Sequence, residues 1–202
     1  REYYSVHAWD RDLPGLSRGS NTEYLSLTIP HFQEKGARFL SAEASDNWGC
    51  NGLGYYLAAR MLWDVREAER IPALIEDFLS KAFGPAKKPM AEFYELIDGR
   101  NKPLPADNAV YRMYRRVVDG FNKPGVPAEL YRKMYRCLGR ARALSNDRAI
   151  TARIDDLILY TRYVELWADY ASADQEQRQA AFECMVRHVF RMRNTMMVHT
   201  YG

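Results

Sequence analysis

The sequence predicts an α/β fragment followed by a mainly α-helical region, in a chain that is predominantly helical overall. Two observations lead to this fold class. The first third of the chain alternates β-type and helical segments. The remainder carries apolar residues at three- and four-residue intervals, which is the pattern of helices that bury one face in a bundle. We therefore expect an α/β part at residues 1–66 and an α-helical domain at residues 67–202.

The α/β part begins with a strand at residues 3–9, where aromatic and β-branched residues dominate. A helix is expected from about residue 23 to residue 35, and Gly36 ends it. A second strand follows at residues 38–44. A strand, a helix and a strand within about 40 residues form a βαβ unit, so we expect the two strands to be parallel. Because a parallel pair needs neighbouring strands, this part resembles a piece of a larger sheet or barrel.

Helical periodicity continues from there to the end of the sequence. Pro72 suits the first turn of a helix that Gly84 and Pro85 then stop. The helices that we expect lie at residues 52–63, 72–83, 89–98, 107–121, 127–144, 147–171 and 174–196. The apolar residues expected to share one bundle core include Leu138, Ile154, Ile158 and Trp167.

Composition and charge argue against several classes of function. The net charge of +3 over 202 residues is too small to indicate nucleic acid or membrane as a partner, and no apolar run approaches the ~18 residues of a membrane span. Three widely spaced cysteines predict neither a disulfide framework nor a zinc site. With no phosphate-binding loop and no pair of histidines at metal-ligand spacing, we expect no cofactor and no metal.

Residues 38–64, RFLSAEASDNWGCNGLGYYLAARMLWD, carry the clearest indication of function in the sequence. Carboxylates, amides and an indole just beyond a strand end are typical of a sugar-binding site, since Trp48 can stack on a sugar ring while Glu43 or Asp46 accepts hydroxyl hydrogen bonds. In the alternative interpretation, Trp48 packs on the following helix and Asp46 caps it. The candidate substrate-binding residues in this stretch are Glu43, Asp46, Asn47, Trp48 and Asn51.

The stretch FLSAEASDNWGCNGLGYYLAARMLWD and the later Phe83-Gly84 pair carry a family resemblance. They resemble the last strand, loop and helix of (β/α)8-barrel glycosidases of the hexosaminidase and α-glucuronidase kind. More closely, they resemble an uncharacterised bacterial domain-of-unknown-function family of secreted glycan-degradation systems. The resemblance implies that residues 3–9 and 38–44 are the last two strands of a TIM-type barrel, with the site at their carboxyl ends. It thereby adds His7, Trp9 and Asp10 to the candidate substrate-binding residues, with a place in the core as the alternative for His7. It also implies a carbohydrate ligand, a secreted or periplasmic location, and catalytic carboxylates on a missing N-terminal part of the same protein.

Two functions remain open at this point. The first is a glycoside hydrolase-like, carbohydrate-active protein in which this chain supplies sugar-subsite residues and a helical region. The second is a non-catalytic helical module that binds a protein or a glycan. Glycoside hydrolysis needs two carboxylates about 5–10 Å apart, a spacing within reach of Glu43 with Asp46 or with Asp10, but surface carboxylates near strand ends are common. The catalytic residues, and whether the chain is an enzyme, are therefore left unassigned.

Basic and aromatic residues alternate at 111–116 and 131–136. Such a pattern is compatible with nucleic-acid binding, but we interpret it as a helix pattern, because tyrosines would line the core while arginines cover the solvated face. The arginines that we expect to be exposed are Arg112, Arg116, Arg132 and Arg136.

Overall fold

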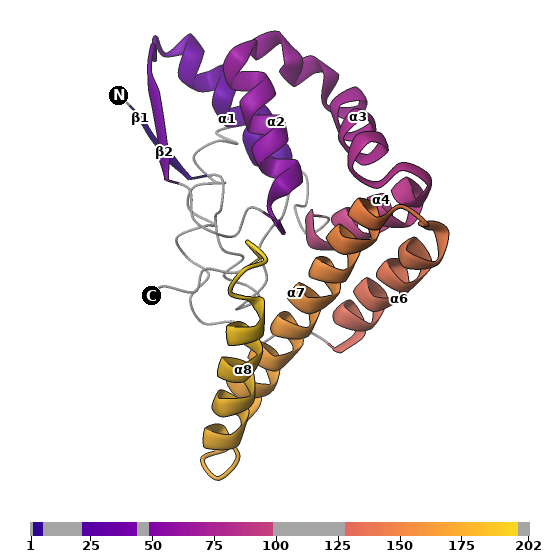
Figure 1. Ribbon diagram of the computed structural model, residues 1–202. Helices are drawn as coiled ribbons and strands as arrows, with labels where there is room; N and C mark the ends of the chain where they lie inside the picture. Colours follow the sequence, from indigo (N-terminus) through magenta and orange to yellow (C-terminus); the bar gives the residue numbers. More distant parts are fainter. Residues whose placement is uncertain (1, 6–21, 44–48, 99–127, 198–202) are drawn as a thin grey trace.

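The computed structural model describes residues 2–5, 22–43, 49–98 and 128–197 (Figure 1). The statements below concern these residues. Their elements, in chain order, are β1 (Glu2–Ser5), α1 (Thr22–Glu34), β2 (Leu40–Glu43), α2 (Gly52–Trp63), the 3-10 helix η1 (Val65–Arg70), α3 (Ile71–Phe83), the 3-10 helix η2 (Gly84–Ala86), α4 (Lys87–Asp98), α6 (Ala128–Leu144), α7 (Arg148–Ser172) and α8 (Arg178–Met192).

The prediction of an α/β fragment of a TIM-type barrel is wrong, because the described fold is helical. Its only strands are β1 and β2, with four residues each. They form a two-stranded sheet, and the predicted parallel pairing is confirmed by a register that sets Glu2 beside Leu40 and Ser5 beside Glu43. Two strands of this length build no sheet layer. Local residue preference predicted two strands of seven residues, whereas the described parts of these strands have four residues each and the rest of the described fold is helical.

The helix predictions in the second half are confirmed where the structure describes them. Pro72 lies in the first turn of α3, and Gly84, with a φ of 49°, follows its last residue. Asp147 caps α7, since its carboxylate accepts the backbone N–H groups of Ala149 and Ile150. The segment predicted as one helix at 174–196 is shorter, because α8 ends at Met192. The helix predicted at 107–121 lies outside the described residues.

The core runs continuously from α1 and α2 through α3 and α4 to the last three helices. Leu138 and Ile154 are fully buried, as predicted, whereas Ile158 and Trp167 are half-buried and pack against this core. The predicted exposure of Arg132 and Arg136 is confirmed, and Arg112 and Arg116 lie outside the described residues. None of the helices described here is both long and apolar enough for a bilayer crossing.

The arrangement of the helices brings distant parts of the chain together. The strand pair lies beside α1 and α2 at one end, and α3 and α4 connect this end to the antiparallel helices α6 and α7 (Figure 1). The α7 and α8 helices form a long hairpin, and the chain after α8 turns back toward the start of α2 (Figure 1). That return places residues near 196 beside the segment that the sequence marks for sugar binding.

Candidate functional site

The predicted sugar-binding residues lie on a segment between β2 and α2. Glu43 is the last residue of β2, and Asn51 directly precedes α2. The structure therefore describes both ends of the segment, which we call the 43–51 segment. The remaining candidates, His7, Trp9, Asp10, Asp46, Asn47 and Trp48, lie outside the described residues.

Asn51 lies inside the protein and not at its surface. Its side chain is 1% exposed, and its carbonyl accepts the N–H group of Tyr55 in the first turn of α2 at 3.0 Å. The side chain makes no capping hydrogen bond to the helix. A fully buried amide does not reach a ligand in solvent, so the structure places Asn51 in the interior at the start of α2.

The downstream end of the 43–51 segment is held by the chain that follows α8. The Gly49 N–H group donates to the carbonyl of Met196 at 2.8 Å, and the Cys50 thiol donates to the carbonyl of Met197 at 3.2 Å. Cys50 and Met197 are both buried. This contact was not predicted from the sequence. No local pattern reveals it, because 147 residues separate Cys50 from Met197.

A hydrogen-bonded network on the exposed side of α2 ties this helix to its neighbours. The Tyr56 hydroxyl donates to Asp77 of α3 at 2.5 Å, and Arg60 donates to Glu67 of η1 at 2.6 Å and to the Tyr56 oxygen at 3.1 Å. Lys81 donates to Asp77 at 2.9 Å. Each carboxylate in the network thus has a cationic partner, an arrangement that suits structural linkage between helices.

The same network shifts the proton affinities of its members. The Lys81 ammonium, followed by the Tyr56 hydroxyl, lowers the pKa of Asp77 below its ordinary value. Desolvation, followed by the hydrogen bond to Asp77, raises the pKa of Tyr56. Asp77 is therefore ionised and Tyr56 neutral at neutral pH, the states in which the hydroxyl donates to the carboxylate. Neither residue is available as a proton donor with a pKa near 7.

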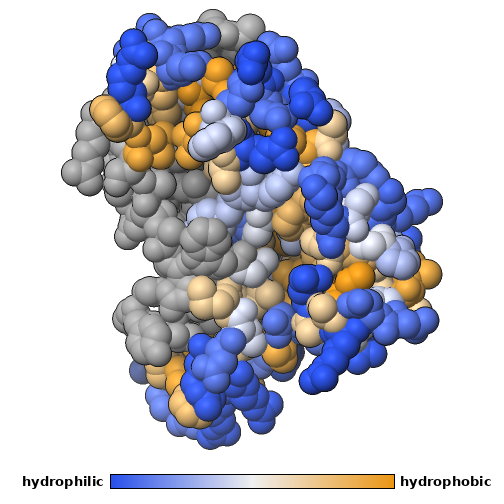
Figure 2. Space-filling model, turned by 45° about the horizontal axis from the view of Figure 1, so that its top comes forward, coloured by the Kyte–Doolittle hydropathy of each residue, from blue (hydrophilic) through white to orange (hydrophobic). Residues whose placement is uncertain are grey.

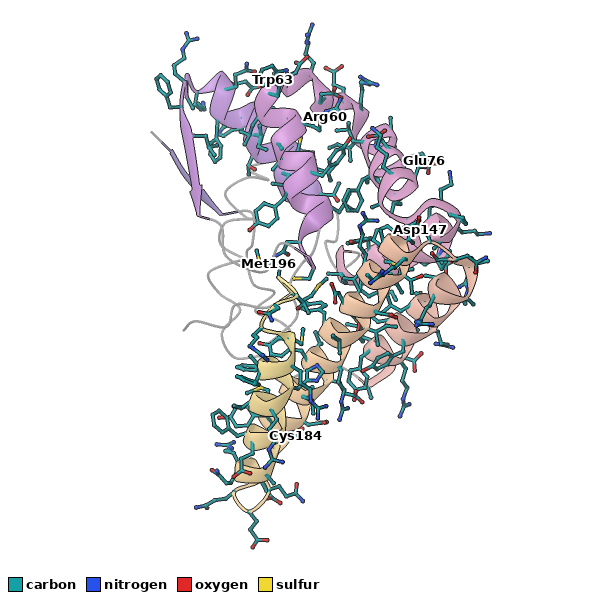
Figure 3. The ribbon with its side chains drawn as sticks, in the orientation of Figure 1. Arg60, Trp63, Glu76, Asp147, Cys184 and Met196 are labelled. Carbon is teal, nitrogen blue, oxygen red and sulfur yellow. The ribbon has the colours of Figure 1, made fainter. Side chains whose placement is uncertain are left out.

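A groove of about 590 Å³ opens at the other end of α2. The groove is lined by residues of α1, of the loop before β2 and of the end of α2. They include Phe32, Gln33, Arg38, Phe39, Leu62 and Trp63. Trp63 is 93% exposed and Phe39 is 80% exposed. Figure 3 shows Trp63 and Met196 well apart, near opposite ends of α2. From this end of the molecule, apolar residues are exposed at the surface among hydrophilic ones (Figure 2).

A second hollow of about 730 Å³ lies between α4 and α6, and four of the charged residues that line it are in ion pairs. Arg140 donates to both carboxylate oxygens of Glu92, at 2.6 and 3.1 Å. Along the basic stretch at 131–136, Lys133 and Arg136 lie 3.6 and 3.5 Å from Glu129. The positive charge of this face is thus partly neutralised, which favours the interpretation as a solvated helix face.

Metal ligation has no support in the part of the chain that the structure describes, where no three His, Cys, Asp or Glu side chains form a group able to hold an ion. Cys50 and Cys137 are buried and Cys184 is exposed, and no disulfide links these three described cysteines. Comparison with protein-family models, with curated proteins and with solved structures yields no match.

Proposed function

We propose that this chain supplies a sugar-binding segment, residues 43–51, to a glycoside hydrolase-like, carbohydrate-active protein. The observation that carries the proposal is the anchoring of the segment. Gly49 and Cys50 are hydrogen-bonded to residues 196–197, and Asn51 is buried at the start of α2. A binding segment whose downstream end, here residues 49–51, is anchored in advance loses less conformational entropy when a ligand binds. The sequence of the segment supplies carboxylates, an amide and an indole for a sugar.

The proposal assigns binding, and not the acid–base step, to this chain. In the described residues around α2, the carboxylates of Glu67 and Asp77 are paired with Arg60 and Lys81. Such pairs lack the separated proton donor and proton acceptor that glycoside hydrolysis needs. The proposal therefore places the catalytic carboxylates in another part of the same protein, which would be the partner of this chain. It also assigns the secreted or periplasmic location that the family resemblance implies.

The test compares two tryptophans: Trp48, which precedes α2 in the sequence, and Trp63, the last residue of α2. Trp48→Ala removes the indole of the segment, and Trp63→Ala removes an exposed indole at the far end of the helix. Affinity for a panel of N-acetylhexosamine and uronic acid oligosaccharides is measured by calorimetry on the intact protein. We expect at least a tenfold loss for Trp48→Ala, no change for Trp63→Ala, and the same melting temperature for both. Wild-type affinity in Trp48→Ala would refute the proposal.

The second candidate function is a non-catalytic helical module that binds a protein or a glycan. The groove between α1 and α2, with Phe39 and Trp63 largely exposed, is the observation that favours it. Exposed aromatic side chains at the edge of a groove are typical of contact residues for a partner. The same two variants separate the two candidate functions. If the helical module binds the glycan through this groove, Trp63→Ala should weaken affinity for the oligosaccharides while Trp48→Ala leaves it unchanged.

A further inference from the structure

The α8 helix carries a stripe of apolar side chains that remain partly exposed. Phe182, Val186 and Phe190 are 44%, 45% and 64% exposed. Because they are spaced by four residues, they lie along one face of the helix. A different side of α8 carries the buried Met185 and Met192, so most of the stripe is left outside the core. We call Phe182, Val186 and Phe190 the α8 stripe.

We propose that the α8 stripe is the contact surface for a second copy of this chain. The two α8 helices pack antiparallel about a two-fold axis that passes beside Val186. This inference goes beyond the proposed function and does not depend on it. The end of the α7–α8 hairpin extends past α6, so this part of α8 is open to a second molecule (Figure 1).

The order of the residues in the stripe matches a two-fold contact. One phenylalanine lies four residues before Val186 and the other lies four residues after it. In an antiparallel two-fold pair, a residue on one side of the axis faces the residue at the same distance on the other side in the second copy. Phe182 therefore packs against the partner's Phe190, and Val186 packs against the partner's Val186. Each apolar side chain thus meets another apolar side chain.

The charges beside the stripe are complementary under the same symmetry. Glu183 and Arg187 lie 3.1 Å apart on the flank of the stripe, and their side chains are 48% and 76% exposed. The two-fold axis brings Glu183 to within about 3 Å, along the helix axis, of the level of the partner's Arg187. Two ion pairs then link the copies, one on each side of the axis. A parallel pair would instead set like charges side by side, which favours the antiparallel arrangement.

A lipid surface is the other occupant that an apolar stripe on a helix can have. The α8 helix carries basic residues such as Arg178 and Arg191, and helices that lie on membranes combine basic and apolar residues. The second copy is favoured for two reasons. The carboxylate of Glu183 at the edge of the stripe would face anionic headgroups, and the symmetric order of the stripe has no role on a lipid surface.

Cysteine cross-linking tests the geometry of the contact. Cys184 is exposed on α8, about 200° around the helix from Val186 and thus nearly on its opposite side (Figure 3). Val186→Cys is made together with Cys184→Ser, and this variant and the wild type are oxidised with copper phenanthroline. Cys50 and Cys137 are buried in both proteins. On non-reducing gels, we expect the variant to form a covalent dimer at least tenfold faster than the wild type. Equal rates would overturn the proposal.

Reversal of the charges tests the ion pairs. Sedimentation equilibrium is measured in a Phe39→Ser, Trp63→Ser background, so that the groove beside α2 does not contribute to association. We expect Glu183→Arg and Arg187→Glu each to weaken dimerisation at least fivefold, and the two together to restore it, at the same melting temperature in dilute solution. Single variants that associate like their background would overturn the antiparallel pairing.

A background protein that stays monomeric would overturn the proposal as a whole. Flotation with phosphatidylserine vesicles would in that case assign the α8 stripe to a lipid surface, provided that Phe190→Ser abolishes the flotation.

Discussion

At the scale of single residues, the buried apolar side chains and the paired charges behave differently, and two substitutions separate their effects. Leu138 is 0% exposed in the centre of α6. Leu138→Ala should lower the free energy of unfolding by about 2–5 kcal/mol, because it removes buried methyl groups and leaves a cavity. Urea denaturation measures the change. Arg132→Ala, on the exposed side of the same helix, is the control and should stay within about 0.5 kcal/mol of the wild type. Equal losses would place Leu138 outside the core.

The pairing of Asp77 predicts a pH dependence of stability. Its folded-state pKa is lowered below the ordinary value of 3.8, mainly by Lys81 and then by Tyr56. A lowered carboxylate pKa contributes stability above the unfolded-state pKa, and this contribution disappears as the pH falls through the folded-state value. We therefore expect Asp77→Asn to be less stable than the wild type at pH 6, with a difference that shrinks below about pH 4. Denaturation across pH 3–6 checks this, and a difference independent of pH would contradict it.

At the scale of elements, helix ends show how local chemistry sets the boundaries. The Asp147 carboxylate accepts the N–H groups of Ala149 and Ile150 at 2.8 and 2.9 Å, and so caps the longest helix, α7. Asp147→Ala should cost about 0.5–2 kcal/mol of stability, because these donors lose their acceptor. Thermal unfolding followed by circular dichroism gives the value. Asn146→Ala, at the preceding exposed position, should have almost no effect, and a similar loss there would argue against the cap.

Helix positions were predictable from the sequence because their signals are local. Proline in a first turn, glycine after a last residue and an acidic cap fix the ends of α3 and α7 within one or two residues. The strands were predicted in the right place and with the right direction, but their number of neighbours is not a local property. The barrel prediction required further strands beside this pair, which the sequence does not show, and it is the part of the fold prediction that is wrong.

The candidate site also has features that the sequence predicts and features that it does not. The composition of residues 43–51 is visible in the sequence, and the structure describes Glu43 and Asn51 at its two ends. The contact of Gly49 with Met196 was not predictable, because it joins two segments through the packing of the helices between them. The burial of Asn51 was not predictable either, since an asparagine before a helix is usually a half-exposed cap.

At the scale of the whole molecule, the open groove beside α2 predicts surface behaviour. Phe39 and Trp63 are exposed aromatic residues that lie close to Leu40 and Leu62. We expect the chain to bind a hydrophobic dye such as ANS and to sediment faster at higher concentration, because this apolar surface favours association. Phe39→Ser with Trp63→Ser should reduce both effects at unchanged stability. Leu27→Ser, at an exposed leucine of α1, is the control. Dye binding that is the same in the double variant would contradict this role of the groove.

The return of the chain from α8 to Gly49 has a consequence for the order of folding. A contact across 147 residues carries a large loop-closure entropy and forms late, after the helices between its ends have brought them together. During synthesis on the ribosome, Gly49 and Cys50 therefore emerge long before Met196 and Met197, to which they are hydrogen-bonded in the folded protein. These two residues remain accessible to proteases and chaperones in that interval, and burial of Cys50 reports that the α7–α8 hairpin has been completed.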